Sequence, residues 1–245
     1  MIFPKMLRWW FLIPAFACAS ATAETPVLVE LFTSEGCSSC PPADQLLAKL
    51  ENQQPVAGVH IIALSEHVDY WDRLGWRDPF SSAQFTGRQQ EYSQLFRDSG
   101  PYTPEMIVDG RTGFVGNQSP DALKAIAQAA RDAKATVRVT SAAGKISVQA
   151  DSVTKAADVV VALTERNLLS NVSRGENAGR KLTHTAVVRW LRVIGKTKPG
   201  ERFAGEVSVS LDKAWKPENL HTVVFLQERS SRKVLGAAEM SLSMP

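Results

Sequence analysis

Two cysteines separated by two residues are the feature of this sequence with the clearest chemistry. Cys37 and Cys40 are the only cysteines after residue 23. Thiol–disulfide exchange needs a thiolate that attacks and a nearby sulfur that resolves the mixed disulfide, and this spacing supplies both. A disulfide closing so short a loop removes little chain entropy. The pair therefore indicates redox chemistry, with Cys37 as the exposed attacking cysteine and Cys40 as the more buried resolving one.

Other uses of the same cysteines stay open. An inert structural disulfide is consistent with an exported protein, because extracytoplasmic compartments are oxidising. A copper site formed by Cys37, Cys40 and His67 is a further alternative, although no methionine cluster accompanies it. A zinc site would need a second ligand pair, and the four histidines are scattered along the chain. We therefore predict neither a metal nor a cofactor.

The flanking residues place the two cysteines between a strand and a helix. Residues 27–32 form an apolar, β-rich run, and residues 41–50 carry apolar side chains at helical spacing. A helix N-terminus favours a thiolate through its unpaired N–H groups and its dipole. Pro41 and Pro42 indicate that the regular helix begins at them, so Cys40 should lie near the N-cap.

The rest of the chain divides into two patterns near residue 135. Residues 27–134 alternate in the order β, α, β, α, β, β, α, whereas residues 135–245 contain about seven short strands and a polar loop over 171–181. This pattern predicts an α/β domain over 24–134 and a mainly antiparallel β-sandwich-like domain over 135–245, an α+β protein as a whole.

The first 23 residues have the features of a secretory signal peptide. Lys5 and Arg8 precede an apolar run over 9–19, and small residues end at Ala23. This pattern predicts cleavage near Ala23 and a periplasmic or secreted protein with no membrane attachment afterwards. Loss of two basic residues brings the net charge of +3 close to zero. We therefore do not expect a nucleic acid as partner, because that binding depends on clustered Lys and Arg.

The element order, with C-x-x-C after the first strand, resembles the thioredoxin fold. The resemblance implies a cis peptide bond before Pro104, which would face the sulfur atoms; a trans proline starting a strand is the alternative. It also implies a buried acid on the first strand, and Glu30 would accept the proton of Cys40 there. The alternative is that Glu30 faces solvent or forms a salt bridge. Gly36 and Thr103, beside Cys37 and Pro104, are the expected substrate-binding residues.

The chain is also similar to a bacterial family of secreted thioredoxin-like proteins described as a domain of unknown function. The matching runs are ELFTSEGCSSCPPAD (30–44), HVDYWDRLGWRDP (67–79), YTPEMIVDG (102–110) and LTHTAVVR (182–189). The chain departs from thioredoxins at Gly36, where they usually have Trp. Its Ser38-Ser39 pair also lacks the histidine or proline that would tune the thiolate.

Several other side chains are candidates for a role at the site. His67 follows the second strand and would assist a thiol, or would simply be packed or solvated. Aromatic residues crowd the same stretch and form either a client-binding platform or a core contact: Tyr70, Trp71, Trp76 and Phe80. His184 lies in a strand-like run and is interpreted as packing.

These observations favour a periplasmic thiol–disulfide oxidoreductase. Its partners would be protein thiol or disulfide substrates and a redox partner protein. The direction of the reaction depends on the relative stability of the dithiol and disulfide states. The alternatives are a copper-delivery protein using the same cysteines and a non-catalytic binding module with a structural disulfide.

Overall fold

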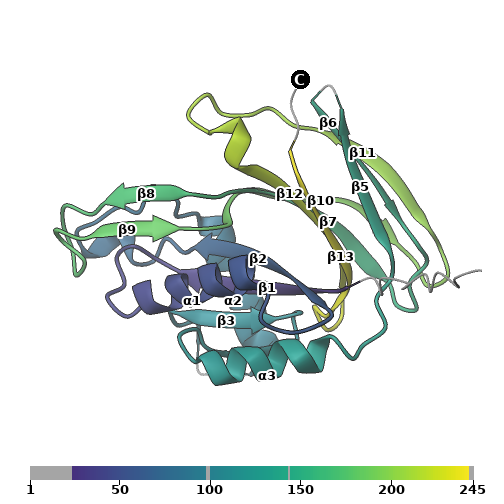
Figure 1. Cartoon of the computed structure of the whole chain (residues 1–245), viewed down its shortest axis with the longest axis horizontal. Coiled ribbons are helices and arrows are strands. Elements are labelled where there is room, and N and C mark those ends of the chain that lie inside the picture. The colour runs from purple at the N-terminus through teal and green to yellow at the C-terminus, as the bar shows by residue number, and fades with distance from the viewer. Residues whose placement is uncertain (1–23, 98–99, 143, 243–245) are drawn as a thin grey trace, which may run out of the picture.

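An eight-stranded mixed sheet runs through the centre of the molecule (Figure 1). The computed structural model describes residues 24–97, 100–142 and 144–242, so the predicted signal peptide lies outside the described residues. The strand order is β13-β12-β7-β10-β2-β1-β3-β4. These strands are β1 (Thr25–Thr33), β2 (Val59–His67), β3 (Glu105–Val108), β4 (Thr112–Val115), β7 (Ala157–Glu165), β10 (Val187–Thr197), β12 (Leu220–Glu228) and β13 (Val234–Ser241).

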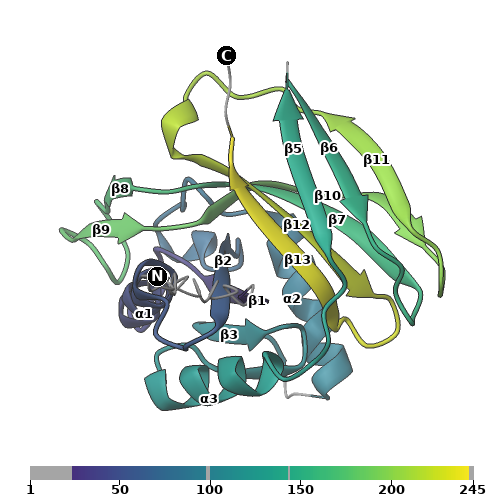
Figure 2. The same ribbon diagram turned by 45° about the vertical axis from the view of Figure 1, so that its right-hand side comes forward.

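Three helices cover both faces of the β2-β1-β3-β4 part of the sheet (Figure 2). Val29 and Leu31 of β1 belong to a core with α1 (Pro41–Gln53) and α3 (Ser119–Ala129). Leu28 faces the other way and packs in a core with Phe85 of α2 (Ala83–Phe96). Burial on both faces explains why β1 is an almost continuous apolar run. The element order of this half confirms the β, α, β, α, β, β, α prediction, with a short 3₁₀ helix η1 (Asp72–Leu74) added.

The second half contributes four strands to the same sheet. β10 runs parallel to β2, with Val187 beside Ser65, and β7, β12 and β13 continue from β10. A separate three-stranded sheet consists of β5 (Val137–Ala142), β6 (Lys145–Ala150) and β11 (Phe203–Ser208). Its Val148 shares a core with Val161 and Val224 of the large sheet. The fold is α+β as predicted. A separate sandwich is not confirmed, because four strands of the second half join the large sheet. The sequence could not show this, since hydrophobic alternation does not reveal which strands pair.

A hairpin projects from the second half over the first. It consists of β8 (Leu168–Asn171) and β9 (Lys181–His184), and it lies beside α1 in Figures 1 and 2. The predicted polar loop is the connection between these two strands. A short 3₁₀ helix, η2 (Pro217–Asn219), precedes β12. The hairpin therefore brings residues of the second half to the start of α1, where the cysteines lie.

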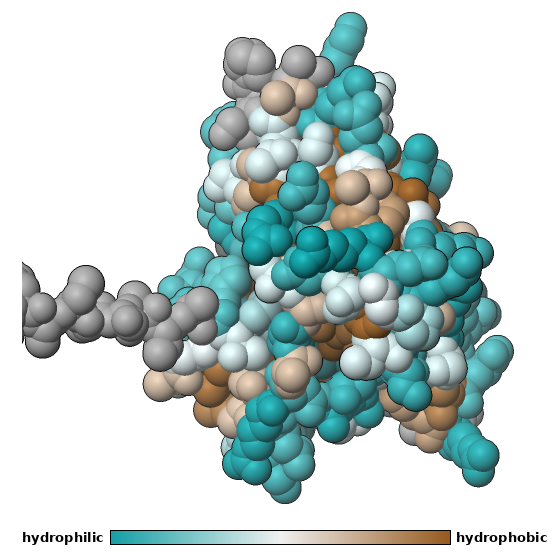
Figure 3. Space-filling model, turned by 90° about the vertical axis from the view of Figure 1, so that its right-hand side faces the viewer, coloured by the Kyte–Doolittle hydropathy of each residue, from teal (hydrophilic) through white to brown (hydrophobic). Residues whose placement is uncertain are grey.

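The surface shows no broad apolar area on the face drawn in Figure 3, where hydrophobic and hydrophilic residues are interspersed. No helix in residues 24–97, 100–142 and 144–242 is long and apolar enough to cross a membrane.

Candidate functional site

Cys37 and Cys40 form a disulfide between the end of β1 and the start of α1. Cys40 is the N-cap residue of α1, and Pro41 and Pro42 occupy the first two helical positions, as predicted. The amides of Ala43 and Asp44 donate hydrogen bonds to the Cys40 carbonyl oxygen. The disulfide therefore lies at the N-terminus of a helix, where the dipole favours negative charge.

Both cysteines are fully buried, which corrects the prediction that Cys37 is exposed. Each has 0% of its surface accessible, whereas Ser38 and Ser39 between them are exposed. The prediction assumed an open helix N-terminus. In the structure, residues from two distant segments cover it: the loop 172–180 between β8 and β9, which we call the cover loop, and the aromatic segment around Trp71.

The cover loop is hydrogen-bonded directly to the cysteine segment. The Asn177 side-chain amide is buried and donates to the carbonyl oxygens of Glu35 and Cys37, at 2.8 and 2.9 Å. Glu176 Oε2 accepts hydrogen bonds from the Ser38 amide and hydroxyl, at 3.1 and 2.6 Å. These bonds join residues about 140 positions apart in sequence. The polar composition of 171–181 was the only sequence signal of this contact.

Trp71 covers the predicted substrate-binding residues. Its indole N–H donates to Thr103 Oγ1 at 2.7 Å. Its Cβ lies 3.1 Å from the position that a Cβ on Gly36 would occupy. Gly36 and Thr103 are therefore brought together with Trp71 between them, and a larger residue at 36 would press on Trp71.

Pro104 adjoins the first turn of α1. The Thr103–Pro104 peptide bond is cis, which confirms the prediction. A Cβ built on Gly116 would lie 3.3 Å from the Cβ atoms of both Ala43 and Pro104, so the two residues flank the same glycine. The structure thus brings Pro104 and the first turn of the helix that follows the disulfide to the same glycine.

Glu30 forms a buried ion pair on the far face of β1. Its carboxylate accepts two hydrogen bonds from Arg88 of α2, each 2.9 Å, and one from the Tyr92 hydroxyl at 2.8 Å. α1 packs on the opposite face of β1, beside Val29 and Leu31. The contacts therefore favour the salt-bridge alternative for Glu30 over proton transfer to Cys40.

Two buried carboxylate–histidine pairs lie beside the segment that carries the cysteines. Asp78 Oδ2 accepts the Glu35 amide at 2.8 Å and contacts His67 Nδ1 at 2.7 Å. Glu35 Oε1 in turn contacts His184 Nε2 at 3.0 Å. All four side chains are buried. His67 is therefore part of the site's support, and so is His184, for which the sequence suggested only packing.

Burial and mutual attraction shift the pKa values of both members of the His67–Asp78 pair. Burial alone would lower the pKa of His67, but the Asp78 carboxylate outweighs it and the pKa is raised. Burial would raise the pKa of Asp78, whereas His67 and the Glu35 and Phe80 amides lower it below its usual range. The charged pair is thus stabilised within the fold.

Asp44 is a further buried acid that the sequence did not single out. Thr33 Oγ1 donates to Asp44 Oδ1 at 2.9 Å. Burial raises the pKa of Asp44, although His184, His67 and the Thr33 hydrogen bond oppose that effect. Its position four residues after Cys40 was visible in the sequence, but its burial was not, because this depends on β9 covering α1.

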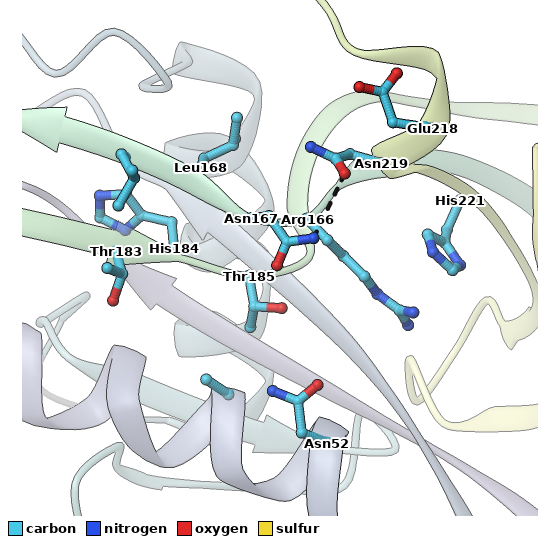
Figure 4. A pocket seen from close by; sticks show the side chains of 12 residues that line it. Asn52, Arg166, Asn167, Leu168, Thr183, His184, Thr185, Glu218, Asn219 and His221 are labelled. Carbon is cyan, nitrogen blue, oxygen red and sulfur yellow. Dashed lines mark hydrogen bonds between the residues drawn. The ribbon is translucent and has the colours of Figure 1, made fainter.

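The described residues contain no cluster of metal ligands, and a polar pocket lies near the site. Within the described part of the chain, no three His, Cys, Asp or Glu side chains converge as metal ligands. A polar pocket of about 530 Å³ lies between the end of α1, the hairpin and η2 (Figure 4). Its Arg166 is paired with Glu51 and Glu239, which accounts for its charge within the fold.

Comparisons with known proteins identify a family and a solved relative. The crystal structure of a structural-genomics protein from Agrobacterium tumefaciens aligns with a TM-score of 0.74 and 28% identity, covering 91% of this chain and 96% of that chain. A domain of the outer membrane lipoprotein Omp28 from Porphyromonas gingivalis aligns with a TM-score of only 0.27 and 13% identity, over 45% of this chain and 97% of that one. No curated protein matches.

The family result agrees with the resemblance seen in the sequence. The matching family model is described as "Protein of unknown function (DUF1223)" and covers residues 28–227, which include the cysteine pair, the cover loop and strands from both halves, but not β13. This chain therefore belongs to the DUF1223 family.

Proposed function

We propose that this protein is an exported thiol–disulfide oxidoreductase of thioredoxin-like architecture that acts through Cys37 and Cys40. The observation that carries the proposal is the disulfide at the N-terminus of α1, with Pro104 and the first turn of that helix on either side of Gly116. The β2-β1-β3-β4 order, with helices on both faces, supports the thioredoxin-like assignment. The predicted signal peptide supports export. The partners would be protein thiols or disulfides and a redox partner protein.

The exchange proceeds in two displacements. A client thiolate attacks Cys37 Sγ, which breaks the Cys37–Cys40 bond, forms a mixed disulfide and releases Cys40 as a thiolate. A second client thiolate then attacks the client sulfur, which forms the client disulfide and releases Cys37 as a thiolate. The client loses two electrons and the protein gains them; the reverse sequence reduces a client disulfide.

Asp44 is the group that we propose for the proton of Cys40, in place of Glu30. Cys40 has helical backbone angles (φ −76°, ψ −38°), so Asp44 lies on the same helical face. Side chains at this spacing have Cβ atoms about 5–6 Å apart. Burial of Asp44 raises its pKa. A protonated Asp44 would neutralise the departing Cys40 thiolate and would take the proton back when the disulfide re-forms.

The test is trapping of the mixed disulfide. Oxidised protein spanning residues 24–245 is incubated with a reduced two-cysteine peptide, and products are resolved by mass spectrometry. We expect peptide oxidation by the wild type, none by Cys37→Ser, and a Cys37-linked adduct that accumulates when reduced Cys40→Ser meets the oxidised peptide. Equal peptide oxidation by the wild type and Cys37→Ser, or no adduct on Cys40→Ser, would contradict the proposal.

A binding module with a structural disulfide is the second candidate. Full burial of both cysteines favours it, because an inert disulfide needs no access. The two candidates differ in reactivity of the folded protein: the binding module predicts partner capture that persists when both cysteines are replaced by serine. Within the described residues, no three His, Cys, Asp or Glu side chains converge as metal ligands, so no contact there favours the copper alternative.

A further inference from the structure

The disulfide is closed off by the protein's own chain at the place where exchange would begin. An attacking thiolate must reach Cys37 Sγ along the S–S axis, and both cysteines have no accessible surface. Asn177 of the cover loop is hydrogen-bonded to the carbonyl oxygen of Cys37 itself. The outer residues Ser38 and Ser39 remain exposed. A macromolecular client would therefore have to displace part of this chain, and the cover loop is the segment that is hydrogen-bonded to Cys37 and Ser38.

The contacts of the cover loop are concentrated at its tip. Asn177 is buried and makes two bonds to the cysteine segment, and Arg180 Nη1 donates to Asn177 Oδ1 at 2.8 Å. The base of the loop is closed by backbone hydrogen bonds between Val172 and both Gly179 and Arg180. Gly175 and Gly179 have positive φ angles of 76° and 79°. Separate sets of hydrogen bonds thus hold the tip and the base of the loop, so the tip can turn away while the base of the hairpin stays paired.

The polar groups that now bind the tip of the cover loop indicate which client groups could bind there in its place. With the loop away, Ser38 would present an amide N–H and a hydroxyl, both of which now donate to the Glu176 carboxylate. Exposed arginines outside the cover loop occur at Arg73 and Arg77. Arg73 and Arg77 flank Leu74 and Trp76, which adjoin Gly175. Donors and positive charge together suit an anionic side chain.

We propose that the cover loop is a lid that occupies the client-binding position, and that the client is an extended acidic segment around a cysteine. A client carboxylate would take over the Ser38 bonds of Glu176, and client amides would take over the carbonyl oxygens bound by Asn177. The client part of this proposal rests on the proposed oxidoreductase function. The lid part does not, since it concerns only access to the disulfide.

The first experiment measures the lid. The rate at which dithiothreitol reduces the disulfide is followed by thiol release in the folded protein spanning residues 24–245. We expect Asn177→Ala to accelerate reduction about tenfold, because it removes two buried hydrogen bonds, and Glu176→Gln about two- to threefold, because its contact is exposed. Asn171→Ala, an exposed amide on β8, is the matched control and should react like the wild type.

The reduction rates of the two variants together test whether the cover loop acts as a lid. Unchanged reduction in both Asn177→Ala and Glu176→Gln would overturn it. Glu176→Gln keeps the test decisive if Asn177→Ala fails to fold, since Glu176 is exposed.

The second experiment measures client chemistry. Two dithiol peptides that differ only in Glu or Lys beside the cysteines are oxidised by the wild type at low and high salt. We expect kcat/KM to be at least about tenfold higher for the Glu peptide, with an advantage that shrinks as salt screens the charges. Equal rates, or a faster Lys peptide, would overturn the acidic client. Faster dithiothreitol reduction in Asn177→Ala with no exchange by either peptide would support the lid while the oxidoreductase function fails.

Discussion

Asp78 shows how one buried carboxylate supports the site from outside the cysteine motif. Its Oδ2 atom accepts the Glu35 amide and contacts His67, and its Oδ1 atom accepts the Phe80 amide at 2.9 Å. Asp78 therefore joins the segment before Cys37 to the end of β2. Breaking a buried charged pair by altering one partner leaves the other charge uncompensated.

Replacement of Asp78 should destabilise the whole protein. For Asp78→Asn we expect the free energy of unfolding to fall by about 3 kcal/mol, the lower end for a broken buried pair. Asp151→Asn is the control, because Asp151 forms an exposed contact of 3.7 Å with Arg138 and should cost less than about 1 kcal/mol. Urea unfolding of both variants measures the difference, and equal losses would contradict the assigned role.

Glu66 is a buried acid with an unusual environment. Its side chain is fully buried, and neither carboxylate oxygen accepts a hydrogen bond from the described residues. Arg88 Nε lies 3.4 Å from Oε1. Burial raises the pKa of Glu66 from 4.5 to about 8, although Arg88 opposes the shift. At neutral pH the folded protein thus keeps a proton here that the unfolded chain releases.

This difference predicts a pH dependence of stability. Between pH 4.5 and about 8, only the folded state holds the Glu66 proton, so this group makes stability fall as pH rises, by at most about 1.4 kcal/mol per pH unit. Glu66→Gln should remove that slope, whereas the exposed control Glu218→Gln should keep it. Urea unfolding at pH 5, 6.5 and 8 tests this, and an unchanged slope in Glu66→Gln would show that the pKa is not raised.

At the scale of elements, two turns from different halves meet closely. Gly110 in the β3–β4 turn has φ +64°, and a Cβ there would lie 2.0 Å from the Arg232 carbonyl oxygen in the β12–β13 turn. The Val234 amide donates to the Asp109 carbonyl oxygen at 2.9 Å. The glycine is therefore required by close backbone approach as well as by its backbone angle.

Two glycine variants distinguish the cost of the backbone angle from the cost of the close backbone approach. Gly110→Ala and Gly144→Ala both place alanine at positive φ, which costs about 1–2 kcal/mol, but nothing lies within 4 Å of a Cβ on Gly144. We expect Gly110→Ala to be more destabilising by about 2 kcal/mol or more, since the turns must separate. Thermal or urea unfolding measures this, and similar losses for both variants would mean that the turns do not pack as described.

At the scale of the molecule, the two halves share the large sheet and a buried apolar cluster. Leu28 and Phe85 of the first half lie in the same buried cluster as Val160 and Phe225 of the second. β10 joins β2 at the centre of the sheet. Neither half can keep its apolar surface from water without the other.

We therefore expect the protein spanning residues 24–245 to unfold in a single transition, seen at the same urea concentration by far-UV circular dichroism and by tryptophan fluorescence. A fragment of residues 24–134 should show no cooperative unfolding, because it would expose the edge of β2 that pairs with β10 and the apolar side chains that pack on Val160 and Phe225. Two separate transitions, or a cooperatively folded fragment, would instead support the predicted boundary between residues 134 and 135.

Local physics explains which features were predictable from sequence. The strand before Cys37 and the helix starting at Pro41 follow from apolar runs and from the restricted backbone of proline, whereas the cis bond before Pro104 was implied by the resemblance to the thioredoxin fold. The cysteine spacing alone indicated a disulfide, and the structure has one. The family followed from four sequence runs, and the family match confirms it.

The accessibility of the sulfur atoms was decided only by the tertiary structure. Asn177 lies 140 residues from Cys37, and His184 lies 149 residues from Glu35, yet each pair is in hydrogen-bond contact. A pattern of neighbouring residues cannot encode such contacts, because they depend on which strands pair and on where the β8–β9 hairpin lies. The sequence by itself thus determined the reactive atoms and their local backbone, whereas long-range packing decided that they are covered.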